Sequence, residues 1–154
     1  MLKLLVNNEN KKRVEVAENI KEQLKEVGIT INIISVNNYK FNNYIKNNNY
    51  DMILTGNVVS TSPILETYFG DNNLSNYTND KLRDLLNDIK KIGNQEDKLK
   101  EKYYEIKEIY KDEMPFISLY FNSVFVLSSK KIKGSFNGNW YNIYYNIDNW
   151  YKTK

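Results

Sequence analysis

The sequence predicts an α/β fold in which parallel strands alternate with helices. An apolar run at Leu2–Val6 is followed by apolar residues at helical spacing between Val14 and Val27, and then by a β-branched run at Ile29–Val36. Strand, helix and strand within about 35 residues form a βαβ unit, whose two strands are parallel. A shorter unit of the same kind ends in the apolar run Tyr50–Thr55. Together the two units predict a sheet with helices packed against it.

Residues that start and stop elements support this order. Asn7–Asn10 supplies a turn and a helix cap, and Gly28 follows the last apolar position of the first helix, where a left-handed glycine ends a helix. A short helix is expected at Tyr39–Ile45, ended by the asparagines Asn47–Asn49. The apolar run Tyr50–Thr55 that follows is interrupted only by Asp51. Such a run is typical of a strand buried on both faces.

Two amphipathic helices are predicted in the second half of the chain. The first has an apolar stripe at Leu82–Ile92, with Thr78 or Asn79 as its cap and Gly93 as its stop. The second has its stripe at Leu99–Tyr110 and ends before the following proline. Both faces opposite the stripes are charged, so each helix is expected to pack on one side only.

Two strands are predicted nearer the C-terminus, at Phe116–Val126 and Trp140–Ile147, joined by the lysine-rich stretch Lys130–Gly138. Side chains alternate along a strand, so Tyr120 and Asn122 share the more polar face, which we expect to face a ligand. Tyr120 offers a flat ring with a hydroxyl, although a place in the core explains the same residue equally well.

Composition excludes most catalytic chemistry. The 154 residues include no His and no Cys, which excludes the usual general base, thiol nucleophiles, thiolate metal sites and disulfides. Asp80, Asp84 and Asp88 lie four residues apart, and we interpret them as a solvated helix face rather than a metal or acid–base site. For Asp51 a structural role at a strand edge is favoured over catalysis. We therefore expect no enzyme, no cofactor and no metal.

The net charge of +3 lies in the second half of the chain, mainly in the lysines after Ser123. A basic tail of this size is interpreted as solvated surface rather than as a contact for nucleic acid or lipid. The chain has only Arg13 and Arg83, whereas phosphate-binding surfaces favour arginine. We therefore expect no nucleic-acid partner.

The loop Gly56–Pro63 contains the candidate ligand site. Parallel α/β sheets bind ligands beyond the carboxyl ends of their strands, and this loop leaves such a strand end. Its small polar residues Asn57, Ser60, Thr61 and Ser62 offer hydrogen bonds to a polar ligand. An ordinary surface loop explains the same residues equally well.

Five segments, taken in order, resemble a known family. They are the helix motif A-x-x-I-x-x-x-L-x-x-x-G-I at Ala17–Ile29, Y-D-x-x-x-x-G at Tyr50–Gly56, N-Y-x-N at Asn76–Asn79, P-x-I-x-L-Y at Pro115–Tyr120, and the chain end around Ile132–Gly134 and Tyr144–Trp150. This order is similar to that of the bacterial extracellular solute-binding proteins of family 5, the peptide- and nickel-type receptors of ABC importers. The resemblance covers nearly the whole chain.

The resemblance implies a lobe of the periplasmic-binding-protein type (type II), with βαβ units, a mixed sheet flanked by helices and a C-terminal β segment. Residues 1–122 are expected to form the second, C-terminal ligand-binding lobe. Residues 123–154 are expected to cross back toward a missing N-terminal lobe. In peptide receptors of the family, Trp and Asp often follow the "Y-D" strand, and the Asp holds the amino group of the peptide. Here those positions are Asn57 and Ser60.

The implied function is non-enzymatic. The chain is expected to be a fragment of an ABC importer receptor that binds peptides, or another small solute, between two lobes and delivers them to the membrane permease. Full-length members are secreted or lipid-anchored, so the whole receptor is expected to be an extracellular, membrane-anchored lipoprotein, although this chain begins without a signal peptide. The alternative is the effector-sensing domain of a transcriptional regulator built on the same fold.

Without a first lobe, apolar residues near the C-terminus lose their cover. Proteins seldom leave such surface and unpaired strand edges exposed. We therefore expect Val124–Trp150 either to fold back on its own lobe or to pair with a second copy of the chain. The residues concerned are Phe125, Leu127, Trp140, Tyr141 and Tyr145.

Overall fold

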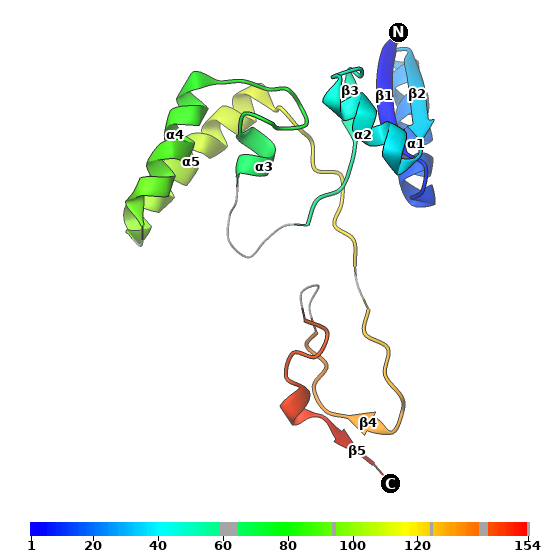
Figure 1. Cartoon of the computed structure of the whole chain (residues 1–154), viewed down its shortest axis with the longest axis vertical. Helices are drawn as coiled ribbons and strands as arrows, with labels where there is room; N and C mark the ends of the chain where they lie inside the picture. Colours follow the sequence, from blue (N-terminus) through cyan, green and yellow to red (C-terminus); the bar gives the residue numbers. More distant parts are fainter. Residues whose placement is uncertain (59–64, 94, 124, 139–141, 154) are drawn as a thin grey trace. The chain divides into compact units, whose positions relative to one another are not determined.

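The chain divides into two compact units, Met1–Phe116 and Ile117–Lys154, in the computed structural model shown in Figure 1. The structure describes residues 1–58, 65–93, 95–123, 125–138 and 142–153. Ser60, Thr61 and Ser62 of the predicted ligand loop, and Trp140 and Tyr141 of the predicted tail, therefore lie outside the described residues.

The first unit begins with a parallel sheet of three strands, β1 (Leu2–Asn7), β2 (Ile31–Val36) and β3 (Met52–Leu54). The strand order is β2-β1-β3, and β1 pairs in parallel with both neighbours. Leu4 lies opposite Ile33 of β2 and opposite the first residue of β3. The βαβ unit with parallel strands, predicted from the sequence, is confirmed.

Helix α1 (Lys11–Glu26) connects β1 to β2 and has defined ends. At its start, the Asn10 side-chain oxygen accepts a hydrogen bond from the backbone N–H three residues on, at 3.0 Å. At its end, Gly28 has a φ of 82°, and the N–H of Ile29 donates to the Leu24 carbonyl at 2.9 Å. This Schellman arrangement satisfies the last carbonyls of the helix and confirms Gly28 as its stop.

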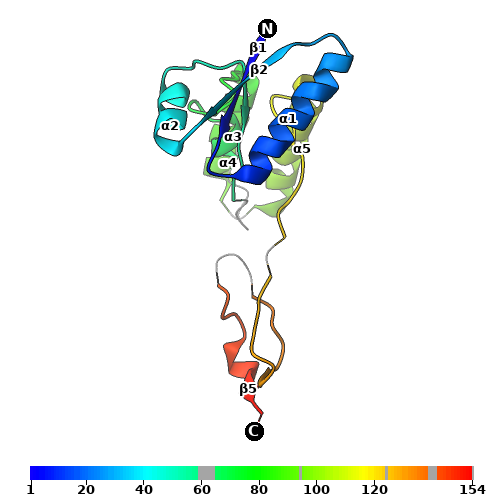
Figure 2. The ribbon, with the colours of Figure 1, turned by 90° about the vertical axis from the view of Figure 1, so that its right-hand side faces the viewer.

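Helices cover both faces of the sheet, and Figure 2 shows α1 and α2 (Asn38–Lys46) on opposite sides of it. Because alternate strand residues point the same way, Leu4 and Val6 share one face, and they form a buried core with Ala17 of α1. Leu5 is equally buried and points to the other face, toward α2. Helix α2 confirms the short helix that the sequence predicts at Tyr39–Ile45.

Strand β3 differs from its prediction. The expected strand at Tyr50–Thr55, buried on both faces, spans only Met52–Leu54, and its side chains are half-buried. The reason is that β3 has a partner on one side only within the described sheet. Asp51 is exposed just before it, where its carboxylate accepts a hydrogen bond from the Lys3 N–H at 2.7 Å. Asp51 therefore has a structural role, extending the pairing of β3 with β1.

After the sheet, the described part of the first unit contains the helices α3 (Glu66–Phe69), α4 (Asp80–Ile92) and α5 (Glu96–Glu113). The two longer helices lie side by side and confirm the predicted amphipathic pair (Figure 1). The stripe of α4 packs against Ile106 of α5, and consists of Leu82, Leu85 and Leu86. No helix in the described part of the chain has the length and apolar character that crossing a bilayer requires.

Side-chain hydrogen bonds connect the start of α4 to the end of α5. Of the two predicted caps, Asn79 takes the role: its oxygen accepts from the Leu82 N–H at 2.9 Å. Its amide donates to the Glu113 carboxylate at 2.9 Å, and the Tyr77 hydroxyl donates to the same carboxylate at 2.6 Å. Gly93, with a φ of 62°, ends α4 as predicted.

Asn73 organises the turn between α3 and α4. It is 5% exposed, and its amide donates to the carbonyls of Gly70 and Tyr77 at 2.8 and 2.7 Å. Its oxygen accepts from the N–H groups of Ser75 and Tyr77, both at 3.1 Å. The Asn73 side chain therefore satisfies four backbone groups that helices and strands leave unpaired.

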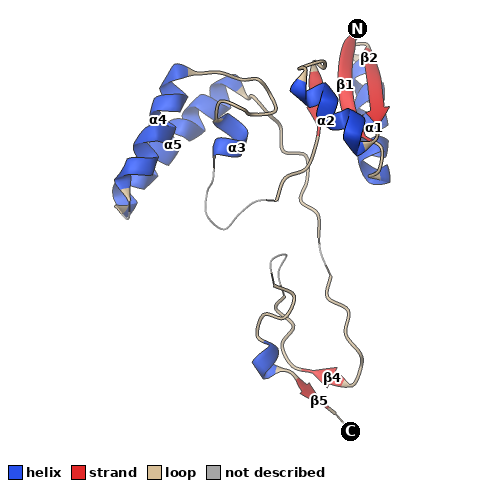
Figure 3. Cartoon of the chain, in the orientation of Figure 1, coloured by secondary structure: helices blue, strands red, loops and turns tan. Residues whose placement is uncertain are grey.

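The second unit contains little regular structure (Figure 3). Strands β4 (Ile132–Lys133) and β5 (Tyr151–Lys152) pair antiparallel, and a 3-10 helix, η1 (Ile147–Asn149), precedes β5. Trp150 packs on Phe136 with ring centroids 4.9 Å apart, and its indole N–H donates to a backbone carbonyl at 2.9 Å. The C-terminal β segment thus exists, but it is short.

The two longer strands predicted in this region are wrong within the described residues. Residues 116–123, 125 and 126 form no strand, and residues 143–146 form a turn. Alternation of side chains predicts an extended chain, but a strand also needs a neighbour to pair with its backbone groups. No described segment supplies that neighbour.

Candidate functional site

The carboxyl ends of the three parallel strands meet at one edge of the sheet in the first unit. There β1 ends at Asn7, β2 at Val36 and β3 at Leu54. We call residues 7–10, 36–38 and 54–57 the carboxyl edge. Ligands of parallel α/β proteins bind beyond an edge of this kind, because the loops that leave it are free to vary while the strands hold them in place.

Hydrogen bonds fix the two turns at the carboxyl edge to each other. The Asn7 oxygen accepts from the Glu9 N–H at 2.8 Å, and the Asn7 amide donates to the Asn38 side-chain oxygen at 3.2 Å. Glu9 in turn accepts from the Asn38 N–H at 3.0 Å, and the Asn8 N–H donates to the Val36 carbonyl at 2.9 Å. The turn after β1 and the turn after β2 therefore form one positioned surface.

Arg13 extends from the first turn of α1 over the end of β3. A β-carbon placed at Gly56 would lie 2.9 Å from the Nη2 atom of Arg13, so the guanidinium rests against the Gly56 backbone. No ion pair joins Arg13 to any described carboxylate. Its side chain is half-buried, and it follows the exposed Lys11 and Lys12.

The charge at this edge suits a polar or anionic group. The first turn of α1 contains no acidic residue, although carboxylates are favoured at helix N-termini and cations are not. Glu9, the acidic residue of the adjoining turn, accepts a hydrogen bond from the Asn38 backbone. Arg13 can donate two parallel hydrogen bonds to a carboxylate, and the asparagines nearby can both donate and accept.

The predicted site residues are distributed over both units. Asn57 lies exposed at the carboxyl edge, directly after Gly56, as the sequence predicts for a strand-end loop. Tyr120 and Asn122 belong to the second unit, where both are exposed. Ser60 and Thr61 lie outside the described residues. Their roles as ligand-binding residues remain predictions.

Sequence reasoning missed Arg13. The usable signal was the run Lys11-Lys12-Arg13 at the start of a helix, because three cations at the positive end of a helix dipole oppose the usual preference. A second signal was Gly56 at the end of a strand, since glycine there allows another group to approach the backbone closely. Neither signal by itself brings the two residues together.

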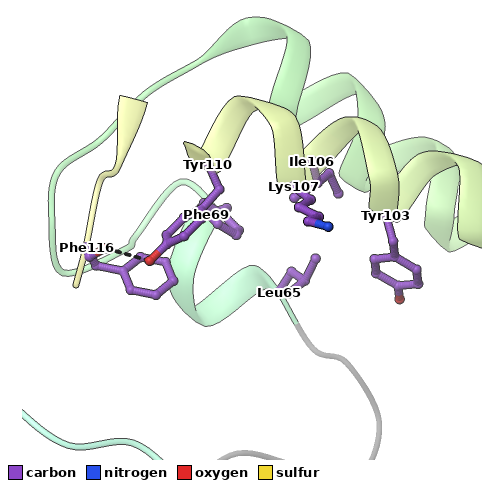
Figure 4. A pocket seen from close by; sticks show the side chains of 7 residues that line it. All are labelled: Leu65, Phe69, Tyr103, Ile106, Lys107, Tyr110 and Phe116. Atoms are coloured by element: carbon purple, nitrogen blue, oxygen red, sulfur yellow. Dashed lines mark hydrogen bonds between the residues drawn. The ribbon is translucent and has the colours of Figure 1, made fainter. Parts of the chain in front are cut away.

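A separate apolar hollow of about 270 Å³ lies beside the helices of the first unit (Figure 4). Tyr110 donates its hydroxyl hydrogen to the Phe116 carbonyl at 3.0 Å, and the two rings lie 5.0 Å apart. Lys107 is the charged residue among those around it. The lining consists of Leu65, Phe69, Tyr103, Ile106, Lys107, Tyr110 and Phe116. This hollow offers packing surface and little hydrogen bonding.

Two tyrosines in the described part of the first unit have a raised pKa. No three His, Cys, Asp or Glu side chains among them lie together as metal ligands. Burial raises the pKa of Tyr50, whose hydroxyl donates to the Leu74 carbonyl at 2.8 Å. Burial and the hydrogen bond to Glu113 raise the pKa of Tyr77. Both tyrosines therefore stay protonated and act as hydrogen-bond donors that join turns.

Comparison with protein families identifies the class of protein to which this chain belongs. Residues 1–79 match the family model of the bacterial extracellular solute-binding proteins, family 5 Middle. The match covers half of the chain and includes every residue of the carboxyl edge. The chain belongs to this family of solute-binding proteins, and membership indicates a binding rather than a catalytic protein. The resemblance seen in the sequence motifs is confirmed.

Comparison with solved structures supports the fold. The chain is similar to the oligopeptide-binding protein AppA from Bacillus subtilis, whose structure was solved in complex with a nonapeptide, with a TM-score of 0.71 and 23% identity. The match covers 99% of this chain and 32% of that chain. The predicted α/β fold of the periplasmic-binding-protein type is thereby confirmed. No curated protein matches the chain.

Proposed function

We propose that this chain contributes one of two lobes to an extracellular receptor that binds peptides for an ABC importer. Membership of the solute-binding family supports the receptor role. The structural neighbour of known ligand is an oligopeptide-binding protein, which favours a peptide over another solute. The observation that carries the proposal is the carboxyl edge, where positioned asparagine turns and Arg13 surround the end of a parallel sheet.

The chemistry of this edge fits a peptide. A peptide backbone alternates N–H donors with carbonyl acceptors, and asparagine side chains can pair with both. We assign Asn57, Ser60 and Thr61 to the backbone of the ligand. Tyr120 and Asn122 stay predictions from the sequence for the same role. Arg13 is assigned to a carboxylate of the ligand, through paired hydrogen bonds.

The whole receptor is proposed to contain more than this chain. Residues 1–122 form the second lobe in this proposal, and residues 123–154 connect it to an N-terminal lobe outside this chain, which spans 32% of the length of its structural neighbour. The two lobes close around the peptide, as hinged binding proteins do. A lipid anchor holds the receptor at the membrane, where it delivers peptide to the permease.

Titration calorimetry of a receptor that contains this chain tests the proposal. We expect peptide pools to bind and sugars, amino acids and nickel to give no heat. Arg13→Ala should weaken the binding of peptides with a free carboxyl end at least tenfold, because a charge-assisted hydrogen bond contributes about 1.5–3 kcal/mol. Arg83→Ala, on α4, is the matched control and should leave the affinity unchanged. Binding of another solute class, with no peptide bound, would contradict the proposal.

A further inference from the structure

The carboxyl edge has more positive charge around it than one ligand carboxylate would offset. The turns after β1 and β2, together with the first helical turn that follows each, contain four cations and one carboxylate, so their formal net charge is +3. The cations are Lys11, Lys12, Arg13 and Lys40, and the carboxylate is Glu9. The loop after β3 leaves this balance unchanged, because the sequence has no charged residue between Asp51 and Glu66.

These cations have no acidic partner in the described part of the chain. No ion pair there includes any of the four. The Oε1 atom of Glu9 accepts from the Asn38 backbone N–H rather than from a cation. A group of cations at the mouth of a site attracts anions over a Debye length, about 8 Å at physiological ionic strength.

The two helices that begin at this edge differ from the other three α-helices of the described chain. The first turns of α1 and α2 contain lysine and no acidic residue. Each of the other three has at least one carboxylate in its first turn: Glu66 in α3, Asp80 in α4, and Glu96 and Asp97 in α5. Carboxylates stabilise the positive end of a helix dipole and cations do not. The cations at the carboxyl edge therefore oppose helix stability, a conflict that is typical of functional sites.

Arg13 gives this charge a defined point of contact. Its guanidinium lies against the Gly56 backbone at the end of β3, where it can donate paired hydrogen bonds to a carboxylate. The three lysines are exposed, and their charges on flexible stems suit further carboxylates at varied positions. A peptide with uncharged side chains has one terminal carboxylate and one terminal ammonium, so its net charge is zero and it leaves the charge of the edge in place. Acidic side chains would offset that charge.

We propose that the carboxyl edge selects acidic peptides, whose aspartate and glutamate side chains interact with Arg13 and with the lysines of the two helix starts. The carboxylates of these side chains, and not the terminal carboxylate alone, set the preference. This inference rests on the proposed function and adds the class of peptide to it.

Titration calorimetry of a receptor that contains this chain tests the proposal with two peptides of equal length and identical termini. One peptide carries aspartates and the other carries asparagines at the same positions, so the terminal carboxylate is the same in both. The aspartate peptide should bind at least about tenfold more tightly, because charge-assisted hydrogen bonds are roughly twice as strong as neutral ones. This advantage should shrink as the salt concentration rises.

A pair of double variants assigns the preference to the carboxyl edge. Lys11→Gln with Lys12→Gln should reduce the advantage of the aspartate peptide by about threefold or more, the scale of two exposed charge pairs. Lys91→Gln with Lys98→Gln is the matched control, since it removes the same charge from exposed positions on α4 and α5. The control should leave the advantage unchanged.

Three results would overturn the inference, and they are distinguishable. Equal binding of the two peptides, or tighter binding of the asparagine peptide, would reject the acidic preference and leave the peptide receptor in place. An equal loss in the two double variants would show that the total charge of the protein, and not the carboxyl edge, sets the preference. Binding of neither peptide, while another solute class binds, would contradict the proposed function itself.

Discussion

At the scale of single residues, the contact between Arg13 and Gly56 links a helix to the end of a neighbouring strand. Gly56 keeps a negative φ, so its importance lies in the space it leaves rather than in its backbone conformation. Sequence reasoning placed Gly56 at the end of a strand and Asn57 in the candidate loop. It missed Arg13, because the approach of a side chain from another element depends on tertiary structure.

Gly56→Ala should displace the Arg13 guanidinium without unfolding the protein. The added methyl lies 2.9 Å from the Nη2 atom, which is the far end of a flexible side chain and can move. We expect the free energy of unfolding to change by less than about 0.5 kcal/mol and peptide affinity to fall toward that of Arg13→Ala. Calorimetry of the double variant provides the check. If the double variant loses the sum of the binding free energies lost by Gly56→Ala and Arg13→Ala, the two residues act separately.

Asn73→Ala should destabilise the first unit by about 3 kcal/mol. The substitution removes four hydrogen bonds to backbone groups, which are buried at Gly70 and partly buried at Ser75 and Tyr77, and an unsatisfied buried group costs about 1–3 kcal/mol. Asn72→Ala is the control, since Asn72 is exposed in the same turn, and it should change stability by less than about 0.5 kcal/mol. Urea denaturation measures both. Equal effects of the two variants would refute the role assigned to Asn73.

At the scale of elements, the sequence predicted those whose signals are local. Gly28 and Gly93 end helices where the apolar stripes stop, and Asn79 caps α4, because capping depends on residues within one turn. The strand predicted at Phe116–Val126 failed because pairing depends on a distant partner. Helix α3, with four residues, is too short to give a periodic signal.

Asn79 has two functions at the start of α4, and two substitutions separate them. Asn79→Ala removes both the cap and the bond to Glu113, and should cost about 1–2 kcal/mol in the free energy of unfolding. Asn79→Asp keeps the cap but places a second carboxylate beside Glu113. Adding Glu113→Gln should then restore part of the stability of Asn79→Asp. Urea denaturation that shows no such recovery would contradict the described contact.

The Tyr77–Glu113 contact predicts a loss of stability at alkaline pH. Burial and the carboxylate raise the pKa of Tyr77 above its ordinary value of 10.0. Because the folded pKa is the higher one, the contribution to stability is complete below pH 10.0 and is lost as the pH rises through the folded pKa. Tyr77→Phe should therefore show a shallower alkaline decline in thermal denaturation. Identical slopes for the variant and the wild type would refute this coupling.

At the scale of the whole molecule, the chain consists of two units. The family and the fold of the sheet-containing unit could be predicted from the sequence, because the motifs and the βαβ pattern lie within that unit. The arrangement of the second unit could not, since its residues depend on contacts that alternation and composition do not specify. The candidate site was predicted at the edge of the sheet where the loop after β3 begins, and the presence of Arg13 there was found only in the structure.

The most direct test of the central claim is a titration of the isotopically labelled chain with a peptide pool, followed by amide chemical shifts. The account predicts shifts at the carboxyl edge, in Asn8–Asn10, Asn37, Asn38, Gly56 and Asn57, with little change along α4 and α5. This measurement detects weak binding, so it suits a chain that is proposed to supply one lobe of a receptor. Shifts confined to the apolar hollow beside the helices, or shifts with another solute class and none with peptides, would contradict the claim.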